Sequence, residues 1–247
     1  MKLSELLIII QDEKKSEDYL RSVGILKTFS NCPRCNGTSL GMIRGDRWKC
    51  YKCKTEWTRR KDSILSLVRI KYSEFLLCLK FFELELTAEE VSKQLNINYK
   101  TVKELYRLFR TAMGGNKVIL TKVFKGTLRK TSEKIGINLI DNKYYFDLEN
   151  AGQTNIAVIE MNRSRISTSA AVYEASIKII QTTRVKTLFD LPPSFQRFVR
   201  FTKEKLFKFR GTDRQFLNLY LKEIEFRFNH QEVDIYGCLE QLISSKF

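Results

Sequence analysis

The sequence predicts an α+β protein with an N-terminal metal-binding module, a group of helices and a mixed α and β domain at its C-terminal end. Three observations support this. Residues 29–60 contain two Cys-x-x-Cys pairs, residues 61–115 repeat apolar side chains at helical spacing, and residues 116–247 combine β-branched runs with helical patterns. With 247 residues, of which 43% are hydrophobic, the chain can bury one large core and a small satellite core.

The chain is strongly basic, and its excess charge is spread over the whole length. Lysine and arginine number 44 against 28 acidic residues, which gives a net charge of +16. The parts on either side of the Gly114-Gly115 pair each hold 22 basic and 14 acidic residues, so the excess is not a tail. Such a surface suits a polyanion, because contacts with phosphates release counterions. The alternative is a basic protein whose charge serves only its solubility.

Residues 1–28 are expected to form a short lead-in helix. The apolar run Leu6–Ile10 ends at polar residues without a small-residue cleavage site, so we do not interpret it as a signal peptide. A helix is expected over residues 16–26, capped by Ser16 and ended near Gly24. No stretch approaches the roughly 20 apolar residues of a membrane span, so we expect no membrane partner. The predicted location is intracellular: nuclear in a eukaryote, cytoplasmic or nucleoid in a bacterial or viral system.

Residues 29–60 carry the most specific motif of the chain. The spacing Cys-x2-Cys-x14-Cys-x2-Cys lets a hairpin bring two thiolate pairs around one tetrahedral ion, for which zinc is the default. Four thiolates leave no position for water, so the predicted Zn²⁺ is structural, one per chain. An iron–sulfur or redox site is the alternative, but the basic residues around the cysteines favour a zinc ribbon that faces nucleic acid. The predicted ligands are Cys32, Cys35, Cys50 and Cys53.

The two remaining cysteines, Cys78 and Cys238, lie on apolar faces of predicted helices and are expected in the core. Because the other four occur as Cys-x-x-Cys pairs rather than as scattered disulfide partners, a reducing compartment is expected.

Residues 61–115 are predicted to be helical. Apolar side chains recur every three or four positions over 63–84, which indicates one long amphipathic helix. Thr87 and Glu90 form a capping box that begins a second helix, and after a turn at Ile97-Asn98 a third helix covers residues 99–113.

The second and third of these helices have the form of a helix-turn-helix, the alternative being any basic helical hairpin. The first turns of its second helix are expected to read the DNA groove, and the later arginines to contact phosphates. Two interpretations of the linker before the long helix stay open: it tracks the DNA backbone, or it is a solvated charged segment. The predicted DNA contacts of this region are Arg59, Arg60, Tyr99, Lys100, Thr101, Lys103, Arg107 and Arg110.

Residues 116–247 contain short β-branched or aromatic runs followed by helical patterns. We predict strands within residues 118–124, 134–140, 143–148 and 155–161, and helices over 169–180, 194–206, 213–228 and 235–243. In the helix over 194–206, cationic residues recur every third position and predict a second, sequence-indifferent DNA surface, the alternative being a solvated basic helix. These residues are Arg197, Arg200 and Lys203.

The order of these motifs resembles a known family. The segments LTAEEVSKQLNINYKTVKELYRLFRTAM and FRGTDRQFLNLYLKEIEFRFN, together with the preceding ribbon, resemble the zinc-ribbon DDE transposases of bacterial insertion sequences and their Merlin-type relatives. The resemblance implies a ribonuclease-H-like domain over residues 116–247, a mixed sheet flanked by helices, in which three carboxylates hold two metal ions for DNA strand cleavage. It also implies work as dimers, larger assemblies or with other DNA-processing proteins.

The three catalytic carboxylates of that family are replaced at the matching positions of this chain. The first acid corresponds to Thr121, the second, by the looser match, to Gln181, and the third to Gln196. Since neutral side chains do not hold two metal ions, the resemblance implies a degenerate, domesticated transposase without catalytic residues. The lone His230 has no paired nucleophile and is expected to be structural.

The sequence therefore predicts a protein that binds double-stranded DNA without cleaving it, in a regulatory, architectural or DNA-processing role. Two other functions stay open. One is an active transposase or nuclease whose acids have been displaced to other positions. The other is a transcription-associated or RNA-associated factor that uses its ribbon for protein contacts.

Overall fold

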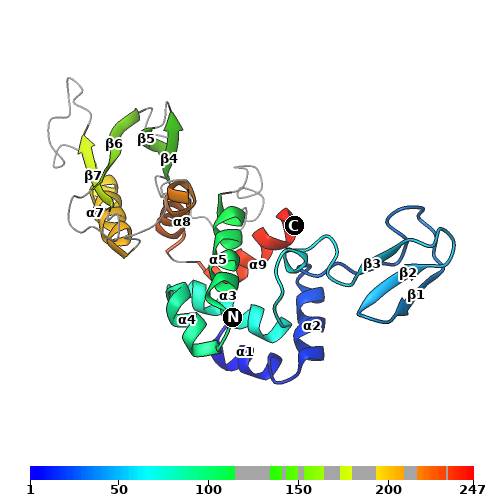
Figure 1. The fold of residues 1–247 in the computed structure, drawn as a ribbon. Helices are drawn as coiled ribbons and strands as arrows, with labels where there is room; N and C mark the ends of the chain where they lie inside the picture. The colour runs from blue at the N-terminus through cyan, green and yellow to red at the C-terminus, as the bar shows by residue number, and fades with distance from the viewer. Residues whose placement is uncertain are drawn as a thin grey trace. The chain divides into compact units, whose positions relative to one another are not determined.

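The computed structural model describes residues 1–114, 134–140, 143–149, 153–163, 173–179, 193–208, 216–231 and 233–247. The chain divides into two compact units. Unit 1 consists of Met1–Val123 and Asp234–Phe247, and unit 2 consists of Phe124–Val233. Each unit combines helices with a small antiparallel sheet, so the chain is a mixture of α and β structure, as predicted (Figure 1).

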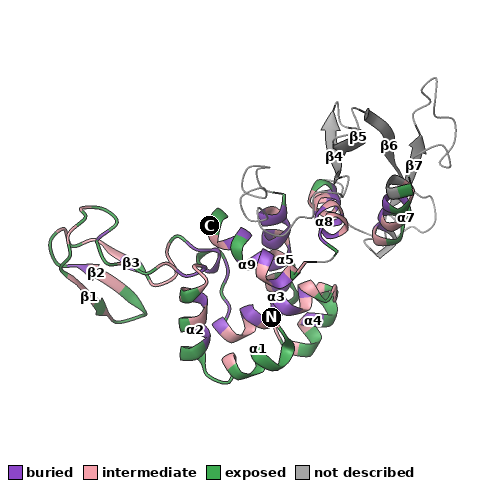
Figure 2. Cartoon of the chain, turned by 180° about the vertical axis from the view of Figure 1, so that it is seen from behind, coloured by how far each residue is buried: buried purple, intermediate pink, exposed green. Residues whose placement is uncertain are grey.

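Unit 1 has a helical core in which aromatic rings meet edge to face. The Phe82 ring centroid lies 4.8 Å from that of Tyr106 and 5.3 Å from that of Phe109, and Phe75 adds a further contact at 5.7 Å from Phe109. All four side chains are buried, because the apolar faces of their helices meet here. Figure 2 shows the buried stretches of α3 and α5 in purple. The helices of unit 1 are α1 (Leu3–Ile9), α2 (Glu13–Ser22), α3 (Tyr72–Glu83), α4 (Ala88–Leu95), α5 (Tyr99–Met113) and α9 (Ile235–Lys246).

The C-terminal helix α9 returns to unit 1, where it packs against α3 and α5 (Figure 1). The sequence instead predicts this helix to be part of the domain 116–247. Tyr236 on α9 is fully buried, and the Tyr19 hydroxyl of α2 donates a 2.7 Å hydrogen bond to Glu240. Lys27 Nζ also donates to the carbonyl of Ser244 at 3.1 Å. These contacts join segments more than 200 residues apart, which no local pattern in the sequence reveals.

The Glu240 carboxyl makes the stability of unit 1 depend on pH. Burial raises its pKa from 4.5 to about 7, and the Asp234 carboxylate raises it further, against the hydrogen bond from Tyr19 and the positive Met1 amino group, which lower it. A carboxyl whose folded-state pKa is raised stabilises the fold fully below pH 4.5 and loses that contribution as the pH rises through about 7.

We therefore expect Glu240→Gln to raise the melting temperature at pH 8. The neutral amide still accepts the Tyr19 hydrogen bond but has no charge to desolvate, and the gain is up to about 3 kcal/mol. Melting curves of both proteins from pH 4.5 to 8 measure the effect. The difference should vanish near pH 4.5, and a difference independent of pH would contradict the assignment.

The predicted long helix over 63–84 is wrong in its first half. Only a short 3₁₀ turn, η1 (Ile64–Ser66), forms there, and α3 begins at Tyr72. The cause is a cap supplied by another helix: the Glu13 carboxylate of α2 accepts hydrogen bonds from the backbone N–H groups of Tyr72 at 3.0 Å and Ser73 at 3.2 Å. These N–H groups lack partners within their own helix, and the Glu74 carboxylate adds a local cap by accepting from the Lys71 N–H at 3.1 Å, so a distant and a local carboxylate together define where α3 begins.

The lead-in helix also begins earlier than predicted. Asp12, not Ser16, caps α2, and its side chain accepts from the Lys14 N–H at 2.9 Å. Ser16 is buried instead, and its hydroxyl donates to the carbonyl of Ile9. The helix ends where expected, since Gly24 has a left-handed backbone with φ of +78°.

The predicted pair of helices α4 and α5 is confirmed. Thr87 and Glu90 form the reciprocal capping box at the start of α4. Asn96 then adopts the left-handed conformation, with φ of 52°, and the Asn98 side chain caps α5 by accepting from the Lys100 N–H at 2.8 Å. In the turn, the Ser92 hydroxyl donates to the carbonyl of Ile97 at 2.7 Å. Local hydrogen bonds thus define the turn between the two helices.

Unit 2 contains an antiparallel sheet in the order β4-β5-β6-β7 and two helices that pack on each other. The mixed sheet implied by the transposase resemblance is not seen among the described strands, all of which pair antiparallel in chain order. Phe228 of the second helix packs against Phe198 of the first, with ring centroids 4.8 Å apart. The elements are β4 (Lys134–Ile140), β5 (Lys143–Glu149), β6 (Gln153–Arg163), β7 (Tyr173–Ile179), α7 (Pro193–Lys208) and α8 (Leu217–Asn229).

Most elements predicted for this region are confirmed, and one is wrong. Three predicted strands correspond to β4, β5 and β6, and three predicted helices to α7, α8 and α9. The predicted helix over 169–180 is replaced by strand β7, which pairs with β6 from Arg163↔Tyr173 to Ala157↔Ile179. Alanine and glutamate favour a helix there, but pairing with a neighbouring strand overrides that weak preference. The strand predicted within 118–124 lies outside the described residues.

Candidate metal centre and basic surfaces

The four predicted cysteine ligands meet in a small three-stranded sheet of unit 1, which we call the cysteine module (residues 29–60). Its strands β1 (Leu40–Ile43), β2 (Arg47–Cys50) and β3 (Glu56–Thr58) pair antiparallel in chain order. Trp57 is buried, and its ring meets that of Phe29 edge to face at 5.7 Å. Besides this tryptophan, the buried core of the module contains Cys32 and Cys50, so little apolar packing supports it.

Each Cys-x-x-Cys pair lies in a turn of the same construction. In the first, the Asn36 N–H donates to the carbonyl of Cys32 at 2.9 Å; in the second, the Lys54 N–H donates to the carbonyl of Cys50 at 2.9 Å. Asn36 and Lys54 both have left-handed backbones, with φ of 56° and 62°. Two equivalent turns therefore present two thiols each toward a common centre.

The four sulfur atoms lie close enough to hold one metal ion. All are within 4.8 Å of one another, and the Cys32–Cys53 and Cys35–Cys50 pairs are each 3.6 Å apart. Among the residues that the structure describes, no other group of His, Cys, Asp and Glu side chains has such geometry.

Hydrogen bonds around the site favour thiolates unequally. The Thr55 hydroxyl and N–H lower the pKa of Cys53 to about 6, and the backbone N–H groups of Cys53 and Lys52 lower the pKa of Cys50. The N–H of Gly37 lowers the pKa of Cys35, but the neighbouring thiols outweigh it and raise that pKa to about 11. Without a cation, four thiolates at this separation repel one another, and a bound ion removes that penalty.

The linker arginines Arg59 and Arg60 make different contacts within unit 1. Arg59 pairs with the buried Glu17 of α2 and, at 2.9 Å, with Asp46. The Arg60 guanidinium lies over the Tyr72 ring, 4.7 Å from its centroid. Arg59 therefore ties the cysteine module to α2, and its predicted role as a DNA contact has little support.

The first turns of α5 expose the predicted polar and cationic residues. Tyr99 is 47% exposed, Lys100 and Lys103 are exposed, and Thr101 is half-buried. Lys103 Nζ lies 6.0 Å from the Tyr99 ring centroid. Neither lysine has an acidic partner within the part of the chain that the structure describes. This end of α5 is thus an unneutralised basic surface.

The two arginines farther along α5 differ from each other. Arg107 pairs with Glu104, whose carboxylate accepts from Arg107 Nε at 2.8 Å, and this pair raises the pKa of Arg107 and lowers that of Glu104. Arg110 is only 8% exposed, and its guanidinium lies over the rings of Phe82 and Tyr106. Little of this side chain is therefore exposed for the predicted phosphate contact. Helical spacing alone does not tell whether a long arginine side chain lies on the surface or along the core.

On α7 the predicted cations are exposed as expected. Arg197, Arg200 and Lys203 are all exposed, while Phe198 and Thr202 of the same helix are buried. The spacing of three places the cations on one face of the helix and the apolar residues on another.

Of the three positions matched to the family's catalytic acids, the structure describes one. Gln196 is half-buried on α7, while Thr121 and Gln181 lie outside the described residues. His230 is buried, stacks on the Phe226 ring with centroids 4.5 Å apart, and its Nδ1 lies 2.6 Å from the carbonyl oxygen of Phe226. That packing agrees with a structural histidine.

No helix in the described ranges has the length and apolar character needed to cross a bilayer. Comparison of the chain with protein-family models, curated proteins and solved structures found no match. The transposase resemblance therefore rests on the sequence motifs alone.

Proposed function

We propose that the protein binds double-stranded DNA through α4 and α5, which act as a helix-turn-helix with α5 in the major groove. The observation that carries the proposal is the exposed start of α5, where Tyr99, Lys100 and Lys103 lie on a rigid helix without acidic partners in the described part of the chain. In a helix-turn-helix the N-terminal residues of the second helix contact the base edges. The net charge of +16 adds a sequence-independent attraction to phosphates.

In this proposal the cysteine module holds one structural Zn²⁺. Four thiolates within 4.8 Å of one another suit tetrahedral zinc and leave no coordination position for a reacting water. The ion would support a module whose own apolar core is very small. The exposed cations Arg44, Lys52 and Lys54 of the module are available to follow a DNA backbone.

The test of the proposal is a binding titration of the full, zinc-loaded chain. We expect random-sequence duplex DNA to bind with an affinity that falls steeply with salt, and selection from a random library to yield a preferred site. Equal or tighter binding of duplex RNA would favour the RNA-associated alternative. Absence of binding to any duplex DNA at low salt would overturn the proposal.

Charge changes on α5 should affect DNA affinity differently at its unpaired lysine and at its paired arginine. We expect Lys103→Ala to weaken DNA binding about tenfold, because an unpaired lysine near the start of the helix is lost. Arg107→Ala should weaken DNA binding less than Lys103→Ala does, since Glu104 already neutralises the Arg107 guanidinium. Glu104→Gln should tighten binding, because it frees Arg107 and removes a negative charge facing the phosphates. Fluorescence anisotropy on one duplex compares them, and weaker binding by Glu104→Gln would contradict the arrangement.

On α7 we propose a second, sequence-indifferent DNA contact in place of an active site. Arg197→Ala/Arg200→Ala should weaken binding to all duplexes alike, with little change in site preference. Incubation with the selected DNA and Mg²⁺ or Mn²⁺ should give no cleavage. Cleavage that disappears on replacing a nearby acid such as Glu204 would instead favour an active nuclease.

A further inference from the structure

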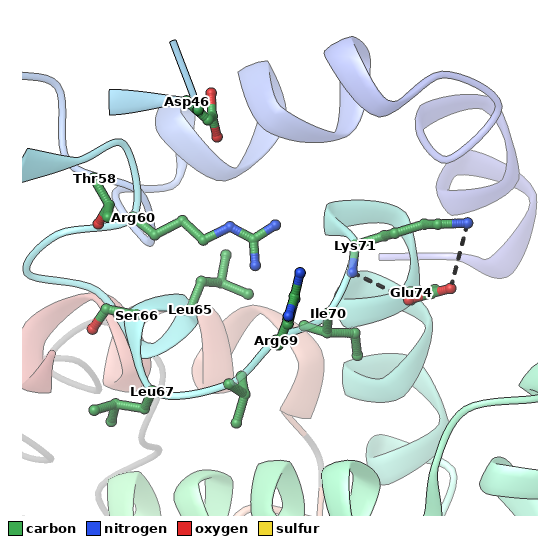
Figure 3. Close-up of a pocket in the computed structure, with 12 residues that line it drawn as sticks. Asp46, Thr58, Arg60, Leu65, Ser66, Leu67, Arg69, Ile70, Lys71 and Glu74 are labelled. Atoms are coloured by element: carbon green, nitrogen blue, oxygen red, sulfur yellow. Dashed lines mark hydrogen bonds and ion pairs between the residues drawn. The ribbon is translucent and has the colours of Figure 1, made fainter. Parts of the chain in front are cut away.

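Unit 1 contains an open cavity of about 730 Å³ between the cysteine module and the segment that leads into α3. The module contributes Asp46, Thr58 and Arg60 to its wall, and the lead-in segment contributes residues 65–71. Two arginine side chains, Arg60 and Arg69, reach into this space (Figure 3). Arg69 lies in the stretch that the apolar spacing predicts to be part of one continuous helix, so the sequence gives no signal of its place at the cavity.

The charges around the cavity do not cancel. Asp46 is paired with Arg59 at 2.9 Å, and Glu74 accepts from the Lys71 N–H at 3.1 Å and lies 3.8 Å from Lys71 Nζ (Figure 3). Both acids of the lining therefore have partners. Arg60 and Arg69, by contrast, have no acidic partner within the described residues. Two like charges facing one cavity repel each other unless an anion lies between them.

Arg60 is oriented by an aromatic ring, and the backbone at Arg69 is flanked by buried residues. The Tyr72 ring lies under the Arg60 guanidinium at 4.7 Å, a contact that orients the planar group. Arg69 is exposed between Val68 and Ile70, and both neighbours are buried. The segment ends at α3, whose first N–H groups are capped by the Glu13 carboxylate of α2. The helix start is therefore already occupied, so the guanidinium groups are the unmatched donors at this site.

We propose that Arg60 and Arg69 together bind one phosphate of a nucleic-acid backbone. A guanidinium presents a planar fork of N–H donors that matches phosphate oxygens, and two such groups neutralise a phosphodiester and satisfy its oxygens from two sides. This inference rests on the proposed DNA-binding function and extends its interface to the junction between the cysteine module and α3.

The experiment measures duplex DNA affinity of the full, zinc-loaded chain over a salt series. We expect Arg69→Gln to weaken binding about tenfold and to lower the slope of log affinity against log salt by about 0.9, the value for one phosphate. Arg60→Gln/Arg69→Gln should lower the slope by no more than the single change, because both groups serve the same phosphate. The matched control is Lys15→Gln on α2, which removes one exposed positive charge away from the cavity.

A second measurement tests the phosphate site of Arg60 and Arg69 independently of DNA binding. In a titration with inorganic phosphate, the side-chain ¹⁵Nε NMR signals of Arg60 and Arg69 should shift while that of the exposed Arg44 does not. If wild-type protein binds DNA but Arg69→Gln behaves like Lys15→Gln, the phosphate site is wrong and the proposed function stands. If wild-type protein binds no DNA, the proposed function fails and the phosphate titration decides the site. Absence of a selective shift in that titration overturns the site in either case.

Discussion

Replacing Cys50 with serine should release the metal and unfold the cysteine module. Structural zinc sites of this type supply about 10–16 kcal/mol of apparent binding free energy, which is folding free energy when the site exists only in the folded state. The module has only Trp57 and two of the cysteines in its buried core, so packing offers little to replace that contribution. Elemental analysis should give one zinc per wild-type chain and less than one for Cys50→Ser, whose module signals should collapse in an NMR spectrum.

The matched control is Cys238→Ala. Cys238 is buried on α9 and does not belong to the group of four cysteines whose sulfur atoms lie within 4.8 Å of one another, so its loss should leave metal binding unchanged. This variant should keep one zinc per chain. A Cys50→Ser protein that retains both its metal and the fold of residues 29–60 would show that the cysteines are not the ligands.

Truncating Phe109 to alanine should destabilise unit 1 by about 3–5 kcal/mol, the usual range for a buried phenylalanine. Its side chain is fully buried on α5, and its ring contacts those of Phe75 and Phe82 edge to face. The cavity left behind lies beneath α5, so DNA binding should be lost along with the fold. Chemical denaturation of the two proteins measures the change in unfolding free energy.

Tyr99→Ala provides the contrast on the same helix. Tyr99 is 47% exposed and contacts no other aromatic ring among the described residues, so the stability change should stay within about 0.5 kcal/mol. DNA binding should nevertheless weaken, because this side chain lies at the start of α5. If Tyr99→Ala costs as much stability as Phe109→Ala, the division of α5 into a buried and an exposed face is wrong.

The features that the sequence predicted correctly are those decided by neighbouring residues. Thr87 and Glu90 of the capping box lie three positions apart, and the backbone hydrogen bonds of each Cys-x-x-Cys turn join residues within a six-residue segment. The helices α7 and α8 repeat their apolar residues often enough to be recognised from periodicity. In each case the interaction that forms the element joins residues that are close together in the sequence.

The secondary-structure predictions that are wrong concern elements whose position depends on a residue far away in the sequence. Glu13 lies about 60 positions before α3 and, together with the local cap from Glu74, places its start at Tyr72. Strand β7 forms because β6 pairs with it, against the helical preference of its own residues. Contacts of cationic side chains also depend on distant residues, since Arg59 pairs with Glu17 and the Arg110 guanidinium lies over the Phe82 ring.

The return of α9 to unit 1 has a consequence for the order in which the chain acquires structure during synthesis. Unit 1 draws its buried residues from both ends, including Leu20 near the start and Leu239 near the end. Residues 124–233 are therefore an insertion, and the ribosome must complete them before α9 exists. Until then α3 and α5 present an uncovered apolar face. The apolar face of α3 and α5 therefore stays uncovered while the residues between Met113 and Ile235 are synthesised, an interval in which it is exposed to non-native association.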